Sequence, residues 1–334
     1  MRKILLVLVG LLTLAFIIFS FAELQSIRAA LAGGNPLFLT GALLVEILCL
    51  VNTSAAFGAL YRLVGLSESR SRLFLMATAA NFVSLIAPSG GASGIAVFLD
   101  GARSRSLPTA RVLVVGVLYV MYEYASLLCI MIPGFAVLML RKELNAAEMI
   151  AGVILLLLML GAGTLLYLGY RSSERLGKHL AWLSRLLNRI LAREVLSAEK
   201  AHAFAADVAE GISSVRGSGR TLLWPLLFTL NNKAVLLCVL ALSFLALNTP
   251  FTLDVLVGSF TISYLFLYIS PTPSGVGFVE GVLPAALNAM GVPWTQAVLI
   301  TLAFRAITVW FPMALGAVSF RALQRQAALH PQAS

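Results

Sequence analysis

Long apolar runs, separated by short polar segments, dominate the chain. A helix that crosses a bilayer needs about 20 mostly apolar residues. Six runs reach about that length, at residues 4–22, 37–63, 108–132, 148–170, 221–247 and 293–320. Each predicts a transmembrane helix, and the third is expected to end at Pro133 and Gly134.

Two further apolar runs are interrupted by segments rich in proline, serine and glycine. Residues 73–99 contain a break at 87–94, and residues 255–290 contain a break at 270–277. Proline and glycine unwind helices, and unwound backbone persists at membrane depth only where protein or water satisfies its polar groups. Each run predicts either two half-helices that meet at mid-depth or two short tilted spans. In both cases the chain leaves the membrane on the side where it entered.

Composition agrees with a membrane protein. Of the 334 residues, 60% are hydrophobic and only 11% are charged, whereas a soluble domain carries about 25% charged residues. The fold class predicted is therefore all-α and integral to the membrane. We expect a polytopic helical bundle that forms a single transmembrane domain over residues 1–334.

The excess of basic residues indicates which side of the membrane each loop lies on. The chain has 24 lysines and arginines against 14 acidic residues. With the N-terminus inside, 19 of the 24 fall in cytosolic segments, three fall outside and two lie within spans. Basic residues favour the cytosolic side, so the pattern predicts N-in/C-in orientation and gives no reason to expect nucleic acid as a partner.

The two breaks are related by a shift of 185 residues, which places Pro88-Ser89-Gly90 on Pro273-Ser274-Gly275. The first break is entered from the cytosol and the second from outside. Residues 37–132 and 221–320 are therefore predicted to be inverted repeats, joined by a cytosolic amphipathic linker at 171–220. Inverted repeats with interrupted helices are typical of alternating-access transporters. The linker is read either as a helix on the inner membrane surface, against anionic lipid heads, or as a solvated helix.

Both breaks are candidate binding sites. The returning half-helices are expected to begin near Gly90 and Gly275, with Ser89 and Ser274 as N-caps and Gly277 in the same segment. Helix N-termini offer free N–H donors and partial positive charge, which suit a phosphate group. The alternative is that the breaks are kinks that allow close helix packing.

Ionisable residues inside spans are costly and usually functional. Arg305 lies in the last span and Glu280 six residues after Ser274. Either Arg305 meets a phosphate while Glu280 orients it, or the two form a purely structural salt bridge.

Polar residues also interrupt two other spans. Asn231 and Lys233 lie in the fifth run. The asparagine either binds a ligand or forms hydrogen bonds to a neighbouring helix. The lysine either binds substrate or extends its ammonium group to the cytosolic interface. Glu123 is a candidate partner for a cation or a proton. Further candidates of the same kind are Glu46, Asn52 and Asn81.

Several chemistries are not indicated. The chain has no Walker loop, no GxSxG or HExxH motif and no histidine or cysteine pair at metal spacing. We therefore expect no enzyme, no ATP, no metal and no cofactor.

The second break and the residues after it carry a family resemblance. Along the chain come a Pro-Gly-rich segment, a Gly-x-x-Glu-Gly motif, a Gly-Val-Pro turn and a helix with one arginine. The matching residues are Pro273, Gly275, Gly277, Glu280, Gly281, Gly291, Val292, Pro293 and Arg305. This pattern resembles the flippase-like transmembrane region of lysylphosphatidylglycerol synthases and their stand-alone relatives. The first break departs from the family pattern, since residues 91–94 contain no carboxylate.

The resemblance implies lipid translocation in a bacterial inner membrane, with membrane lipids as partners. Because the resemblance spans nearly all 334 residues, we expect no aminoacyl-transferase domain and no synthesis of lysylphosphatidylglycerol. The expected substrate is an anionic phospholipid or a polyprenyl-phosphate-type lipid. Two alternatives stay open: an ion- or proton-coupled transporter of a small polar solute, and a non-transporting membrane partner of a lipid-modifying enzyme.

Overall fold

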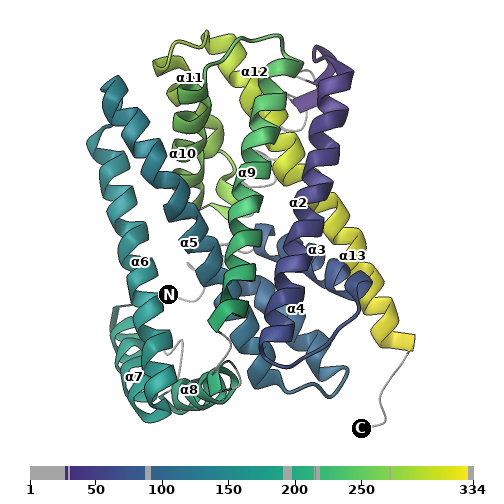
Figure 1. Ribbon diagram of the computed structural model, residues 1–334, viewed down its shortest axis with the longest axis vertical. Coiled ribbons are helices and arrows are strands. Elements are labelled where there is room, and N and C mark those ends of the chain that lie inside the picture. Colours follow the sequence, from purple (N-terminus) through teal and green to yellow (C-terminus); the bar gives the residue numbers. More distant parts are fainter. Residues whose placement is uncertain are drawn as a thin grey trace, which may run out of the picture.

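The computed structural model describes residues 27–28, 31–86, 92–190, 198–213, 215, 219–270 and 272–329, and over these residues it contains helices and no strand (Figure 1). The first predicted span, residues 4–22, lies outside the described residues. The helices are α2 (Pro36–Leu63), α3 (Arg70–Ile86), α4 (Ala92–Arg103), α5 (Thr109–Arg141), α6 (Ala146–Arg171), α7 (Ser173–Ile190), α8 (Ala198–Ser213), η1 (Gly219–Leu222), α9 (Leu223–Ala246), α10 (Leu253–Ile269), η2 (Pro273–Gly275), α11 (Val279–Ala289), α12 (Trp294–Arg305), η3 (Ala306–Trp310) and α13 (Phe311–Leu329).

Five helices in the described part of the chain are long and apolar enough to cross a membrane. They are α2, α5, α6, α9 and the continuous helix Trp294–Gln326, which joins α12, η3 and α13. Each coincides with one of the predicted spans. The ends of these helices follow local capping rules: the Asn35 side chain accepts a hydrogen bond from Leu37 N at the start of α2, and Asn145 and Glu148 form a capping box on α6.

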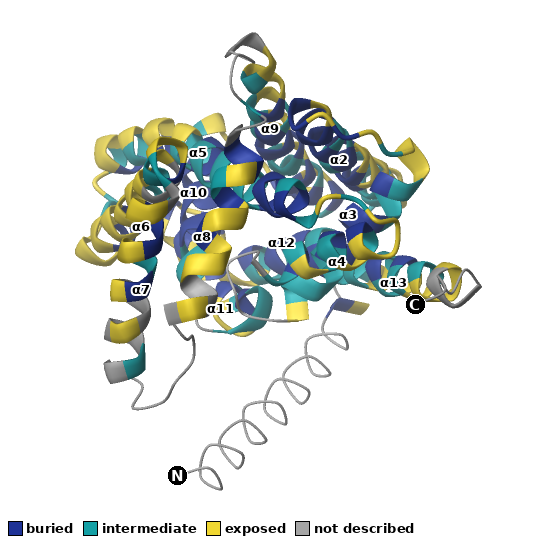
Figure 2. Cartoon of the chain, turned by 90° about the horizontal axis from the view of Figure 1, so that it is seen from below, coloured by how far each residue is buried: buried dark blue, intermediate teal, exposed yellow. Residues whose placement is uncertain are grey.

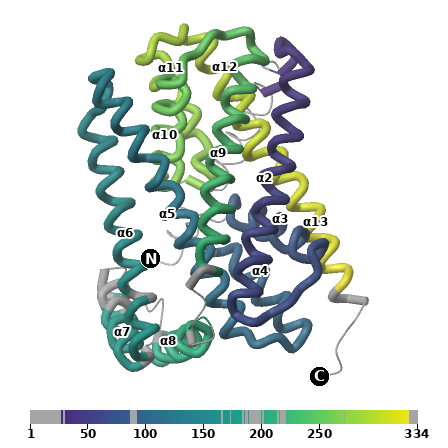
Figure 3. The backbone as a smooth tube through the Cα atoms, viewed as in Figure 1, coloured from purple at the N-terminus to yellow at the C-terminus, as the bar shows by residue number. Residues whose placement is uncertain are grey.

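The two interrupted runs form two pairs of shorter helices. In the orientation of Figures 1 and 3, α3 and α4 lie in the lower half of the bundle, whereas α10 and α11 lie in the upper half. Each pair returns to the end of the molecule from which it came, and the second break packs against α3 at mid-height. This arrangement is the one that oppositely oriented halves require. The inverted-repeat relation itself stays a prediction.

Each helix pair has its own hydrophobic core. One core surrounds α10 and α11 and contains Phe260, Leu283 and Leu287. The other surrounds α3 and α4 and contains Tyr61 and Phe98. Helices α2 and α5 contribute residues to both cores, so they connect the two halves. Seen from below in Figure 2, buried residues gather among these central helices, whereas α6 exposes much of its outer surface.

Helix α5 does not end at Pro133, as the sequence predicted, but continues to Arg141. Proline removes one helical hydrogen bond, yet a helix in a bilayer has no water to satisfy its backbone if it unwinds. The close contact of Gly134 with α10 also holds this segment, because a Cβ at Gly134 would lie 1.9 Å from Thr261 Oγ1. Packing with the neighbouring helix therefore overrides the local signal.

The linker between the halves contains two helices where the sequence predicted one. The amphipathic helix α7 is followed by α8, which packs against both α7 and α5. At Gly211, a Cβ would lie 2.7 Å from the Ala110 carbonyl oxygen, so only glycine allows α8 to come this close to α5. The position of α7 on the inner membrane surface stays a prediction.

A matched pair of glycines tests whether packing at Gly134 holds α5 to α10. Gly134→Ala should destabilise the protein by about 1–3 kcal/mol, because the added methyl group overlaps Thr261. Gly161→Ala on α6 should be neutral or stabilising by up to about 1 kcal/mol, because nothing lies within 4 Å of its Cβ position. Thermal unfolding in detergent compares the two, and equal shifts of Tm for both variants would contradict the packing.

Candidate functional site

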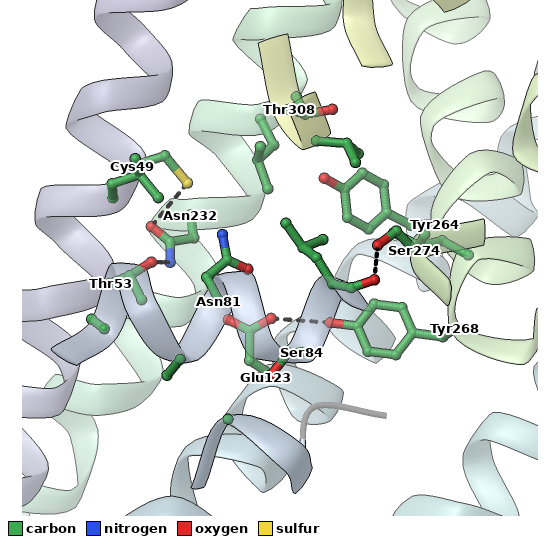
Figure 4. A pocket seen from close by; sticks show the side chains of 18 of the residues that line it. Cys49, Thr53, Asn81, Ser84, Glu123, Asn232, Tyr264, Tyr268, Ser274 and Thr308 are labelled. Atoms are coloured by element: carbon green, nitrogen blue, oxygen red, sulfur yellow. Dashed lines mark hydrogen bonds between the residues drawn. The ribbon is translucent and has the colours of Figure 1, made fainter. Parts of the chain in front are cut away.

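A cavity of about 530 Å³ lies between the two hydrophobic cores, at the level of the second break, and several polar and charged side chains stand in its largely apolar walls. Its walls come from α2, α3, α4, α5, α9, α10, the second break and the junction of α12 with η3. Figure 4 shows Asn81, Glu123, Asn232, Tyr264 and Tyr268 around this space. The polar side chains of several spans therefore converge at one place, although they lie far apart in sequence.

Lys233 and Glu123 form an ion pair in the cavity wall. Lys233 Nζ lies 2.5 Å from Glu123 Oε2, and the lysine side chain is only 3% exposed. Lys233 Nζ also lies over the rings of Tyr264 and Tyr268, at 5.5 Å and 5.8 Å from their centroids. The lysine therefore does not extend to the cytosolic interface, because its ammonium group is held inside the bundle by the Glu123 carboxylate and the two tyrosine rings.

Two tyrosine hydroxyls hold the Glu123 carboxylate. Tyr268 Oη donates to Oε2 at 3.1 Å, and Tyr119 Oη lies 3.4 Å from Oε1. Tyr119 and Glu123 are one helical turn apart on α5, whereas Tyr268 comes from α10. The carboxylate thus joins three helices through one cation and two neutral donors.

A set of side-chain hydrogen bonds joins α2 to α9. Asn52 Nδ2 donates to Asn232 Oδ1 at 2.5 Å, and Asn232 Nδ2 donates to Thr53 Oγ1 at 2.8 Å. Asn231, which the sequence analysis assigned to the site, is exposed on the outer side of α9 and does not line the cavity. Successive residues of a helix point about 100° apart, so Asn232 occupies the position expected for Asn231.

Arg305 connects the last long helix to the second break. Its side chain is 2% exposed and forms an ion pair with Glu280 through Nε, while Nη2 donates to the Ser274 carbonyl oxygen at 2.7 Å. The predicted pairing of Arg305 with Glu280 is therefore present. The arginine is the last residue of α12, and the π turn η3 begins directly after it. Such π turns change the direction in which the neighbouring side chains point, and they occur often at functional sites.

Ser274 is not the N-cap that the sequence predicted. Helix α11 begins at Val279, and Ser274 has a left-handed backbone with φ of 54°. Gly275 and Gly277 also have positive φ, of 66° and 79°, so this segment cannot continue as a right-handed helix. The N-terminus of α11 is accompanied by the carboxylate of Glu280 in its first turn.

The Ser274 side chain instead joins the second break to α3. Its Oγ donates to the carbonyl oxygen of Leu85 at 2.5 Å, near the end of α3. The second break is therefore bonded to the last turn of the helix that precedes the first break, and Figure 4 shows Ser274 beside the cavity. Ser89 and Gly90, the corresponding candidates of the first break, lie outside the described residues.

Glu46 is a cavity residue that the sequence analysis ranked below the others. It lies on the face of α2 that also carries Cys49, Thr53 and Phe57, and this spacing of three to four residues marks one side of a helix. Glu46 is 3% exposed, and its Oε2 has no hydrogen-bond partner in the described part of the chain.

The cavity can hold a polar group that carries charge of either sign. Lys233 and Arg305 supply two positive charges, and each is paired with a carboxylate. Tyr264, Asn81 and Thr308 also line the cavity, and their hydroxyl and amide groups can donate hydrogen bonds. Among the described residues, no three histidine, cysteine, aspartate or glutamate side chains lie together in a way that would bind a metal ion.

Comparison with known families gives one match. A family model described as the lysylphosphatidylglycerol synthase TM region matches residues 3–316. No curated protein matches the chain. No solved structure matches it either.

The hydrogen bonds between α2 and α9 can be tested with two adjacent asparagines. Asn232→Ala should destabilise the protein by about 1–2 kcal/mol, because it removes the partner of Asn52 and Thr53. Asn231→Ala should change stability by less than about 0.5 kcal/mol, because this side chain is exposed. Thermal unfolding in the same detergent measures both, and a larger loss for Asn231→Ala would contradict the geometry.

Proposed function

Because the chain belongs to the family of lysylphosphatidylglycerol synthase transmembrane regions, we propose that it moves an anionic lipid between the leaflets of a bacterial inner membrane. The protein is a multi-pass membrane protein. The family match is to the transmembrane region, so the proposal concerns translocation of a lipid and not its synthesis. The substrate class proposed is an anionic phospholipid or a polyprenyl-phosphate-type lipid.

One observation carries the proposal: helices α3 and α4 and the second break border a single cavity, and Lys233 and Arg305 line it. A lipid headgroup cannot cross the apolar interior without polar partners. Ionisable groups at this depth are costly to maintain and usually serve transport. The headgroup would pass through the cavity while the acyl chains stay in the surrounding bilayer.

The two cations have different parts in this proposal. Lys233 uses one of its three N–H donors on Glu123, so the other two are available to a phosphate oxygen. Arg305 holds Glu280 and the Ser274 carbonyl through Nε and Nη2, which leaves the N–H groups of Nη1 as the donors that would bind the phosphate. Glu280 then orients the guanidinium, and Ser274, Gly275 and Gly277 shape the backbone beside it.

The two hydrophobic cores supply the moving parts. Interiors of folded proteins are close-packed and move as units, so each helix pair is expected to tilt with its own core. The cavity lies at the boundary between the two cores. Helices α2 and α5 cross this boundary, and they line the cavity with Glu46, Thr53 and Glu123. Tilting of one core against the other would open the cavity to each leaflet in turn, which is alternating access.

A second candidate function is transport of a small polar solute coupled to an ion or a proton. The buried Glu46 carboxyl favours it, since this group has no cation of its own. The two functions differ in what crosses the membrane: a lipid with its chains in the bilayer, or a solute that enters a vesicle.

Reconstitution distinguishes the two functions directly. Purified protein in liposomes should speed the movement of fluorescent phosphatidylglycerol between leaflets relative to protein-free liposomes. Phosphatidylcholine should move more slowly, because its ammonium group offsets the phosphate charge. Equal phosphatidylglycerol rates with and without protein would contradict the proposal.

Arg305→Ala should slow phosphatidylglycerol movement roughly 10- to 100-fold. Hydrogen bonds to charged groups contribute about 1.5–3 kcal/mol, and each 1.4 kcal/mol is tenfold in rate. The matched control is Arg321→Ala, an exposed arginine farther along the same helix, which should leave the rate unchanged.

Because Arg305→Ala also leaves Glu280 without its cation, folding is checked by size-exclusion chromatography and helical content. A second readout separates binding from stability: the ratio of phosphatidylglycerol to phosphatidylcholine rates should fall in the variant. An unchanged ratio in a folded variant would show that Arg305 does not meet the phosphate.

A further inference from the structure

We propose that a second cavity, formed by α3, α4 and α13, binds an anionic phospholipid from the leaflet that the sequence places on the cytosolic side. Arg72 binds the phosphate, and one acyl chain lies along the apolar walls of the cavity. This site is separate from the cavity described above, here called the first cavity, and it does not depend on the proposed function. Three features support it: the polarity of the lining, the length of the cavity and the hydrogen bonds of Arg72.

The second cavity has a volume of about 900 Å³, and protein pockets that bind ligands have about 300–1,000 Å³. Helix α3 packs against both α4 and α13, and each of these three helices forms one side of the cavity. The lining includes Arg72, Met76 and Val83 of α3, Ala96, Val97, Asp100, Gly101 and Ser104 at the α4 side, and Phe320, Leu323 and Gln324 of α13. Other residues of α3 and α4, among them Asn81 and Phe98, line the first cavity. The two helices therefore form a wall between the two cavities.

The lining changes from charged to apolar along the second cavity. Arg72 lies in the first turn of α3 and Ser104 directly follows the end of α4, both toward the lower end of the bundle in Figure 3. Met76 and Val83 follow along α3 toward mid-height. At the rise of an α-helix, Arg72 and Val83 are about 16 Å apart, and the hydrocarbon of one leaflet is about 15 Å thick. An acyl chain whose phosphate lies at Arg72 therefore extends to the apolar end of the cavity.

Arg72 is the cation that remains for a phosphate. The neighbouring Glu68 carboxylate accepts two hydrogen bonds from Arg105 Nη1, at 2.8 Å and 3.1 Å. Arg72 Nε lies 3.6 Å from this carboxylate and has no hydrogen-bond partner in the described part of the chain. Arg72 Nη2 donates only a long bond of 3.3 Å to the neutral Ser104 hydroxyl. Because Arg105 holds the carboxylate, the Arg72 guanidinium is free to bind an anion such as phosphate.

Asp100 is the acidic residue of the lining and opposes an anionic headgroup. It is exposed, and it lies one helical turn before Ser104, which contacts Arg72. Water and salt weaken the repulsion by an exposed carboxylate, whereas Arg72 is only 19% exposed. The two residues therefore predict opposite effects: removing the charge of Arg72 weakens lipid binding, and removing that of Asp100 strengthens it.

The occupant of the second cavity can be identified by photocrosslinking. Full-length protein is placed in nanodiscs of phosphatidylcholine that contain phosphatidylglycerol with a photoreactive diazirine in one acyl chain. Mass spectrometry should find the lipid attached to peptides of α3, α4 and α13 that line the cavity. Val97→Trp fills the cavity and should remove most of this labelling. The matched control is Val318→Trp, since Val318 is 66% exposed on α13 and lines neither cavity, and it should be labelled like wild type.

The headgroup is tested by competition with unlabelled phosphatidylglycerol and phosphatidylcholine. For wild type, phosphatidylglycerol should compete better. Arg72→Gln should lower this preference roughly tenfold, because it removes a hydrogen bond between charged groups, and Arg72→Lys should keep most of it. Arg70→Gln removes an exposed arginine of the same helix that does not line the cavity and should have no effect. Asp100→Asn should raise the preference. These variants decide the question even if Val97→Trp does not fold.

Four outcomes would overturn the assignment. The first is labelling that spreads evenly over the lipid-facing helices, α6 included. The second is equal competition for Arg72→Gln and Arg70→Gln. The third is displacement of the lipid by inorganic phosphate as effectively as by phosphatidylglycerol, which would indicate a site for free phosphate. The fourth is loss of the labelling in folded Arg305→Ala, because that residue lines only the first cavity. Labelling of the second cavity in a protein that moves no lipid would support this site and contradict only the proposed function.

Discussion

The bond network of Arg305 is the interaction on which the centre of the molecule depends. A guanidinium group inside a bilayer must find all its partners within the protein. Arg305 finds them in the Glu280 carboxylate and the Ser274 carbonyl. It thereby fixes an unwound segment to a long helix. Because Ser274 also reaches the Leu85 carbonyl, this fixed segment joins the second half of the chain to α3 in the first half.

The remaining architecture follows from the same constraint. Each broken helix pair is surrounded by its own apolar core, and polar groups that cannot face lipid collect at the boundary between the cores. There, Lys233 and Glu123 satisfy one another, and asparagines join α2 to α9. A cavity at mid-depth thus follows from the need to keep these charged and polar groups away from lipid. Its use for a lipid headgroup is the function that we propose.

Much of this fold is predictable from sequence because hydropathy and Pro-Gly breaks are local signals. Five spans, the second break and the Arg305–Glu280 pair agree with the structure. What sequence reasoning missed depends on tertiary packing. The rotational position of α9 determines that Asn232, and not Asn231, faces the cavity. The ion pair with Glu123, which is distant in sequence, keeps Lys233 from reaching the interface. Likewise, left-handed backbone displaces the start of α11, and helix α8 packs closely on α5 through Gly211.

The central claim is that one cavity becomes accessible to each side of the membrane in turn. Ser263 lines this cavity and is buried, and a cysteine there is close in size to serine. In a chain whose Cys49, Cys129 and Cys238 are replaced, Ser263→Cys can be labelled in vesicles by a thiol reagent that does not cross membranes. If the cavity opens to both sides, the cysteine is labelled both when the reagent is outside and when it is inside. Labelling from one side alone, after long exposure from each, would contradict this claim.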